Sequence, residues 1–125
     1  MRARHNLASR YLEPVEKSVA GYIKTLGFSL PATAKFSADG TPVLEDSAVY
    51  RNAEYYSAGI KDLLWFCVRL ALVEALYPTD QPTLILDDPF VNMDDKTTDK
   101  ARSLLRELSK KYQIVYFTCK EERKI

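Results

Sequence analysis

Apolar residues recur at spacings of three and four between residues 12 and 26, a pattern that predicts an amphipathic helix. Proline is tolerated in the first turn of a helix, so Pro14 predicts a helix that begins near Glu13. Residues 1–12 are then expected to form a separate lead-in. Gly27 is a suitable C-terminal stop for this helix.

The stretch TAKFSADGTPVLED, residues 33–46, predicts two short strands. Asp39 and Gly40 lie between them, and this dipeptide is a strong local signal for a β-hairpin. The following segment, residues 47–56, mixes polar and aromatic residues without a clear period, and it receives no assignment.

Residues 57–78 predict a long helix that is more apolar than the first one. Ser57 is a good N-cap, Pro78 stops the pattern, and the body is rich in leucine and alanine. The segment is apolar on almost every side, so we expect the helix to be buried on most of its faces.

Two further apolar stretches, TLIL at 83–86 and QIVYFTC at 113–119, predict buried strands. A third helix between them is expected to be capped by Asp94 or Asp95. The alternation of helices and strands after residue 57 indicates an α/β layer with mostly parallel strands. One face of the third helix is apolar and contains Ala101, Leu104, Leu105 and Leu108.

Composition and charge place few limits on function. The chain has 125 residues, is 46% hydrophobic and 28% charged, and carries a net charge of +1, all typical of one globular domain. We expect a cytoplasmic protein, because no membrane-spanning run or signal-like segment is present. Cys67 and Cys119 are widely separated and predict free thiols, and the lone His5 argues against a histidine-based metal site.

The strongest chemical signal is the pair Asp87 and Asp88 directly after an apolar strand. Adjacent carboxylates at a partly desolvated position require a compensating cation or proton. The carboxyl end of a parallel strand is where α/β proteins bind ligands, and aspartates there commonly hold Mg²⁺. Upstream, Ser57 and Gly59 open the long helix, so backbone N–H groups and the positive end of the helix dipole are available to an anion.

Three segments in this order carry a family resemblance. YSAGIKDLLWFCVRLALVEAL resembles the signature motif of ABC-type ATPases, in the form used by SMC, RecN and RecF-like chromosome proteins. TLILDDPFVNMDD resembles their Walker B strand and D-loop, and QIVYFTCKEERK resembles their switch strand. The resemblance implies a P-loop NTPase-like fold. Residues 1–125 would be the C-terminal lobe of a head, with a coiled-coil exit region at 1–30 and the motifs within 31–125.

The resemblance implies a role for each matching residue. Asp87 would serve the Mg²⁺ ion, and Asp88 would be the catalytic base. Ser57, Ala58 and Gly59 would meet the γ-phosphate of ATP on a facing head, and Asp94 would contact that head. The position of the catalytic switch histidine falls on Lys120, whose ammonium could meet the γ-phosphate as a point charge but cannot replace a neutral imidazole donor.

The sequence contains no G-x-x-x-x-G-K-[ST] phosphate loop. In the resembled class this loop belongs to the N-terminal half of the head. The resemblance therefore implies the C-terminal half of a split SMC-like head, acting in DNA repair or chromosome maintenance. Its implied partners are the N-terminal lobe, a second head and DNA, with no membrane. On this interpretation the isolated chain has no ATPase activity.

Two other interpretations stay open. The chain could be a non-hydrolysing module, derived from such a head, that only dimerises or binds DNA. A phosphotransfer domain of the response-regulator kind would need a phosphoacceptor aspartate and a downstream lysine. Lys120 fits that pattern, but the helix predicted over 57–78 does not. Simple capping is also a sufficient explanation for Asp95.

Overall fold

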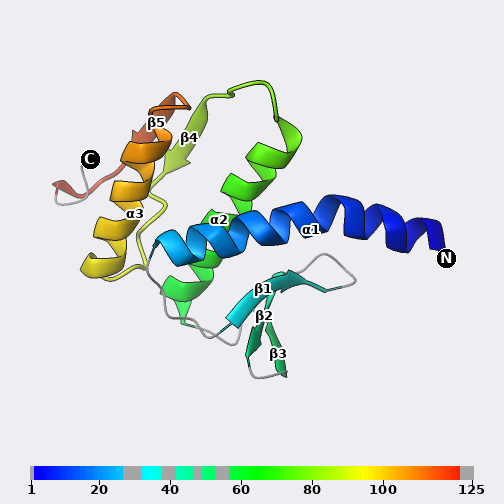
Figure 1. Cartoon of the computed structure of the whole chain (residues 1–125). Helices are drawn as coiled ribbons and strands as arrows, with labels where there is room; N and C mark the ends of the chain where they lie inside the picture. The colour runs from blue at the N-terminus through cyan, green and yellow to red at the C-terminus, as the bar shows by residue number, and fades with distance from the viewer. Residues whose placement is uncertain (1, 27–31, 38–41, 47–48, 53–56, 122–125) are drawn as a thin grey trace.

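The computed structural model describes residues 2–26, 32–37, 42–46, 49–52 and 57–121. Its elements are, in chain order, α1 (Arg2–Thr25), β1 (Ala32–Phe36), β2 (Pro42–Asp46), β3 (Val49–Asn52), α2 (Ala58–Leu76), β4 (Leu84–Asp87), α3 (Asp95–Leu108) and β5 (Ile114–Phe117). In Figure 1, α1 lies across α2 and above the β1–β3 sheet, while α3, β4 and β5 lie on the other side of α2.

The first helix is longer than the sequence predicts. It is continuous from Arg2, so the expected start near Glu13 and the separate lead-in over residues 1–12 are wrong. Pro14 lies inside the helix and removes the hydrogen bond to the Arg10 carbonyl. Both residues are exposed, so water can reach this carbonyl. The expected stop at Gly27 lies outside the described residues.

The hairpin predicted over residues 33–46 is part of a three-stranded antiparallel sheet in the order β1-β2-β3. The two predicted strands are present, and β3 comes from the segment that received no assignment. Glu16 of α1 accepts a hydrogen bond from the Phe36 N–H at 2.9 Å, which joins this sheet to the helix. In the described part of the chain, parallel pairing is confined to β4 and β5, as expected for the layer after residue 57, and the N-terminal sheet is antiparallel, as expected for a hairpin.

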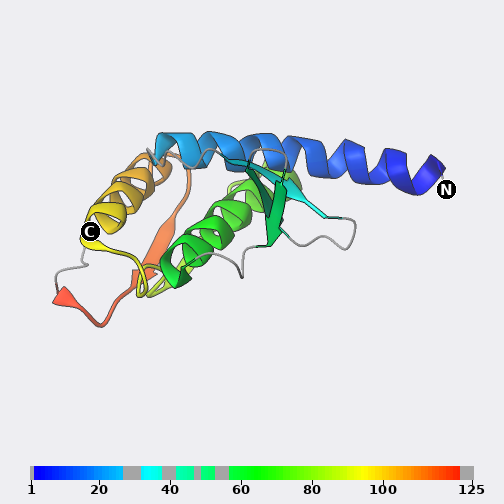
Figure 2. The same ribbon diagram turned by 90° about the horizontal axis from the view of Figure 1, so that it is seen from below.

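One hydrophobic core joins the helices and the parallel strand pair. The second half of α1 contributes Val15, Val19 and Ile23, and Leu26 directly after the helix is also buried. The middle of α2 is buried, as predicted, although Leu72 and Leu76 near its end are exposed. Figure 2 shows α1 along one side of the molecule, with its N-terminal turns extending beyond the other elements.

The strands β4 and β5 are less buried than predicted. Leu84 is 8% exposed and belongs to the core, but Ile85 is 70% exposed and Phe117 is 54% exposed. Side chains alternate between the two faces of a strand, and only one face of this pair packs on the core. The prediction of fully buried strands is therefore wrong for the outer face.

Across the described residues, none of the helices is long and apolar enough to cross a membrane.

Candidate functional site

The structure places the predicted site residues at two separate locations. Ser57, Ala58, Gly59 and Asp94 line one pocket of about 450 Å³. Asp87 and Asp88 lie instead at the carboxyl end of β4. The acid pair lies at a strand end, as the sequence indicated, whereas the position of Asp94 beside Ser57 did not follow from the sequence.

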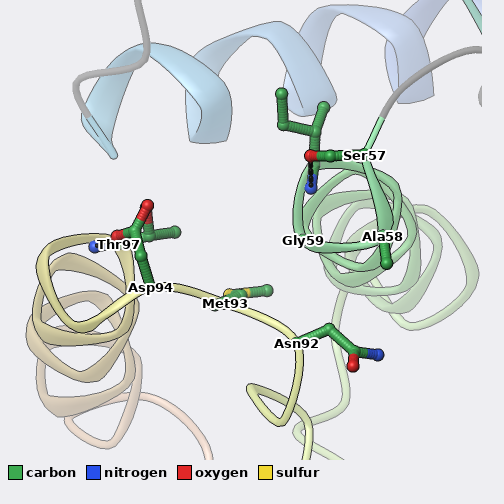
Figure 3. A pocket seen from close by; sticks show the side chains of 8 residues that line it. Ser57, Ala58, Gly59, Asn92, Met93, Asp94 and Thr97 are labelled. Atoms are coloured by element: carbon green, nitrogen blue, oxygen red, sulfur yellow. Dashed lines mark hydrogen bonds between the residues drawn. The ribbon is translucent and has the colours of Figure 1, made fainter.

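The pocket lies between the first turns of α2 and α3 (Figure 3). Ser57 is the N-cap of α2, but its Oγ is 3.5 Å from the Ile60 nitrogen, so the cap bond is long. The Ser57 hydroxyl is exposed, and α2 has no acidic residue in its first turn. This side of the pocket therefore offers a hydroxyl, unpaired N–H groups of a helix start and the positive end of a helix dipole.

The other side of the pocket is the segment that leads into α3. Met93 is buried beneath it, and Asp94 is the N-cap of α3. Asp94 was expected from the sequence, whereas Asn92, Met93 and Thr97, which line the same pocket, were not. Their position before and after a predicted helix cap was the signal that could have identified them.

Gly59 allows this segment to approach α2 closely. A Cβ atom added to Gly59 would lie 2.7 Å from the carbonyl oxygen of Asn92. The Asn92 amide also donates a hydrogen bond to Asp62 of α2 at 2.8 Å. The absence of a side chain at position 59 thus sets the width of the pocket.

We predict that Gly59→Ala lowers the free energy of unfolding by about 1–3 kcal/mol, because the new methyl group meets backbone atoms that cannot move easily. Gly21→Ala is a matched control, since a Cβ there meets no atom within 4 Å. In an exposed helix this control should stabilise the protein by about 0.5–1 kcal/mol. Urea denaturation of both variants measures the difference. Equal stabilities would contradict the close approach.

Asp94 is held by its own helix. Its Oδ1 accepts a hydrogen bond from the Thr97 N–H at 2.7 Å, and this bond is the main reason why the pKa of Asp94 lies below its usual 3.8. A carboxylate with a lowered pKa stabilises the fold at pH values above its unfolded pKa. This contribution is lost as the pH falls through the folded pKa.

We therefore predict that Asp94→Asn reduces the acid sensitivity of the protein. The asparagine oxygen can still cap α3, but it does not titrate. Below pH 3.8 the parent should lose free energy of unfolding more steeply than the variant does. Urea denaturation at a series of pH values tests this, and parallel profiles would show that Asp94 makes no contribution.

At the second location, two strand ends are joined by a backbone bond. The Asp88 N–H donates to the Phe117 carbonyl at 2.7 Å, one step beyond the last parallel pair, Asp87 with Phe117. Asp88 has a φ of 41°, a left-handed conformation that aspartate adopts more readily than most residues. This turn ends β4 and separates the two adjacent carboxylates, and the Asp87 side chain is exposed.

Cys119 is the functional candidate that the sequence analysis missed at this edge. Its Sγ donates a hydrogen bond to Asp88 Oδ2 at 3.2 Å. Both cysteines are free, as predicted. Lys120 follows with an exposed side chain, and its backbone N–H bonds to Thr118 Oγ1 at 3.2 Å. The roles of Lys120, Asp87 and Asp88 stay predictions.

No protein-family model and no curated protein matches the sequence. Solved structures do match its fold. A structure described under ATP-driven dimerization and DNA-stimulated activation of SMC ATPases has a TM-score of 0.73 and 19% identity, over 94% of this chain and 74% of that one. The chain has an SMC head fold.

Two more neighbours support this fold. The SMC head bound to the C-winged helix domain of ScpA has a TM-score of 0.71 and 19% identity, over 95% of this chain and 38% of its own. The SMC head domain from Thermotoga maritima has a TM-score of 0.66 and 20% identity, over 96% of this chain and 43% of its own. The chain thus has the fold of part of an SMC head and spans less than half of these two neighbours.

Proposed function

We propose that this chain is the C-terminal half of an SMC-like ATPase head, which binds and hydrolyses ATP once an N-terminal half supplies the phosphate loop. The observation that carries the proposal is the division of its polar groups into two separated half-sites, the pocket at Ser57 and the strand edge at Asp88. Two heads facing each other would bring the pocket of one to the nucleotide on the other.

The exposed apolar face of β4 and β5 supports completion by another lobe. Ile85 and Phe117 are both more than half exposed, on strands that pack on the core with one face only. Exposed apolar side chains on a short sheet are suited to contact a further layer of protein. The N-terminal lobe is the proposed occupant, because the matched heads extend well beyond the length of this chain.

The strand edge has suitable donors for Mg²⁺. Among the described residues, no group of three or more histidine, cysteine, aspartate or glutamate side chains could hold a metal ion alone. Mg²⁺ at Asp87 would therefore take its other ligands from phosphate oxygens and water, as it usually does at nucleotide sites. The ion would neutralise phosphate charge, while Asp88 would orient and deprotonate the attacking water.

The pocket has the character of an anion site. Ser57, Ala58 and Gly59 offer donors at a helix start, in a position to meet the γ-phosphate held by a facing head. Asp94 would contact that head. We further propose a cytoplasmic protein that acts on DNA in repair or chromosome maintenance.

The test uses a head completed by an N-terminal half, with the isolated chain as the inactive reference. Ser57→Glu should abolish ATP-dependent dimerisation in sedimentation experiments but keep nucleotide binding, because its carboxylate repels the facing phosphate. The change removes a cap bond that is already long at 3.5 Å, while a negative charge at a helix start interacts favourably with the helix dipole, so the fold should be intact. Ser103→Glu, at an exposed position on α3, is the control and should dimerise normally.

Normal ATP-dependent dimerisation of Ser57→Glu would contradict the phosphate role of the pocket. Dimerisation without any ATP hydrolysis in the parent would favour the non-hydrolysing interaction module. Stimulation of hydrolysis by double-stranded DNA tests the proposed association with DNA.

A further inference from the structure

A thiol and the proposed catalytic carboxylate are hydrogen-bonded at the edge of the parallel strands. Cys119 Sγ lies 3.2 Å from Asp88 Oδ2, although the two residues are 31 positions apart in the sequence. Parallel pairing of β4 with β5 brings them together, because Asp87 lies opposite Phe117 and each chain continues past that pair.

Both partners of this contact are held by the backbone. The Asp88 N–H is bonded to the Phe117 carbonyl, and the φ of 41° at Asp88 sets the direction in which its side chain leaves the strand. On the other strand, Thr118 Oγ1 accepts the Lys120 N–H at 3.2 Å, which forms a tight turn around Cys119. The hydrogen bond is thus supported by local structure on each side.

The carboxylate keeps the thiol in its donor form. The hydrogen bond to Asp88, and then the Asp88 charge, raise the pKa of Cys119, with the nearby Lys120 charge acting in the opposite direction. At neutral pH the sulfur therefore carries its proton. A neutral thiol is a weak donor, so it can orient a carboxylate without the large loss of basicity that a cationic donor would cause.

We propose that Cys119 is a positioning residue that orients the Asp88 carboxylate for ATP hydrolysis. This inference rests on the proposed function, and it adds Cys119 to the residues that the sequence singled out at this strand edge. Hydrolysis requires Asp88 to face the attacking water, and the Cys119 bond restricts rotation of the carboxylate.

The first experiment measures steady-state ATP hydrolysis in the completed head. Cys119→Ala should lower kcat by roughly 10-fold with little change in KM, because the base is present but poorly oriented. Cys119→Ser retains a donor and should restore kcat to within about 3-fold of the parent. Cys67→Ala is the control: it removes the other free thiol, which is buried in the middle of α2, and should leave kcat of the folded protein unchanged. An unchanged kcat in Cys119→Ala would overturn the proposal.

The second experiment uses the chain of 125 residues alone and iodoacetamide at one fixed pH, with the rate at Cys119 followed by mass spectrometry. Asp88→Asn should accelerate alkylation several-fold, because the thiol loses the charge that keeps it protonated. Asparagine also tolerates the backbone conformation at this position. Asp87→Asn is the matched control and should react at about the parent rate.

The two experiments distinguish a failure of the proposed ATPase function from a failure of the Cys119–Asp88 contact. A completed head without ATPase activity would overturn the proposed function and the positioning role with it. The alkylation rates would still show whether thiol and carboxylate are bonded. Equal rates in the parent, Asp88→Asn and Asp87→Asn would overturn the contact itself, even in an active head.

Discussion

Replacing Asp88 with asparagine in a completed head should lower ATP hydrolysis by roughly 100-fold or more, the usual scale for the loss of a general base. Nucleotide binding should be retained, and ATP-dependent dimers should last longer because the nucleotide is not consumed. Asparagine has the same shape and tolerates the φ of 41° at this position, so the fold should be preserved. Single-turnover hydrolysis and sedimentation with ATP measure the two effects.

Asp87→Asn is the informative comparison for this prediction. Its side chain is exposed at the end of β4, where it would serve the metal. This variant should weaken Mg²⁺-dependent nucleotide binding itself, which the Asp88 variant should not do. If Asp88→Asn hydrolyses ATP at the parent rate, the assignment of Asp88 as the base is wrong and the acid pair is a structural remnant.

The largest expected loss of stability follows from Phe90→Ala. Phe90 is completely buried in the segment between β4 and α3, and its ring packs edge-on against Phe66 at 5.3 Å between centroids. Its ring also packs against Tyr116 of β5, at 5.9 Å between centroids. Removal of the ring should lower the free energy of unfolding by about 3–5 kcal/mol, a large part of the total for a small domain.

Val91→Ala is the control for Phe90→Ala. Val91 is the next residue but is 50% exposed, so its truncation should change stability by less than about 1 kcal/mol. Urea denaturation of the isolated chain measures both variants. A loss below about 1 kcal/mol for Phe90→Ala would show that this ring does not anchor the segment in solution.

The elements after residue 57 were predictable because their signals are local. A serine cap, a long apolar body and a proline stop define α2, and Asp94 caps α3 as expected. Pro14 misled the prediction of α1, because the helix continues through the proline with one backbone hydrogen bond missing. β3 was missed because a strand is stabilised by the strands it pairs with, and the local sequence does not identify these partners.

The sequence singled out candidate site residues but not the contacts between them. Asp87, Asp88, Ser57 and Gly59 stood out by residue type and position. That Asn92 approaches Gly59 and Cys119 approaches Asp88 depends on the spacing between elements and on the pairing of β4 with β5. The Cys119 contact could have been derived from that pairing, had the alignment of the two strands been known.

The first helix can pass mechanical force from its projecting end to the rest of the molecule. Its 24 residues make a rod of roughly 36 Å at 1.5 Å per residue, and its second half contributes Val15, Val19 and Ile23 to the core. Tyr22, on the embedded half, donates a hydrogen bond to Glu74 near the end of α2. A torque applied to the projecting N-terminal turns is therefore transmitted to α2, whose opposite end forms the wall of the pocket.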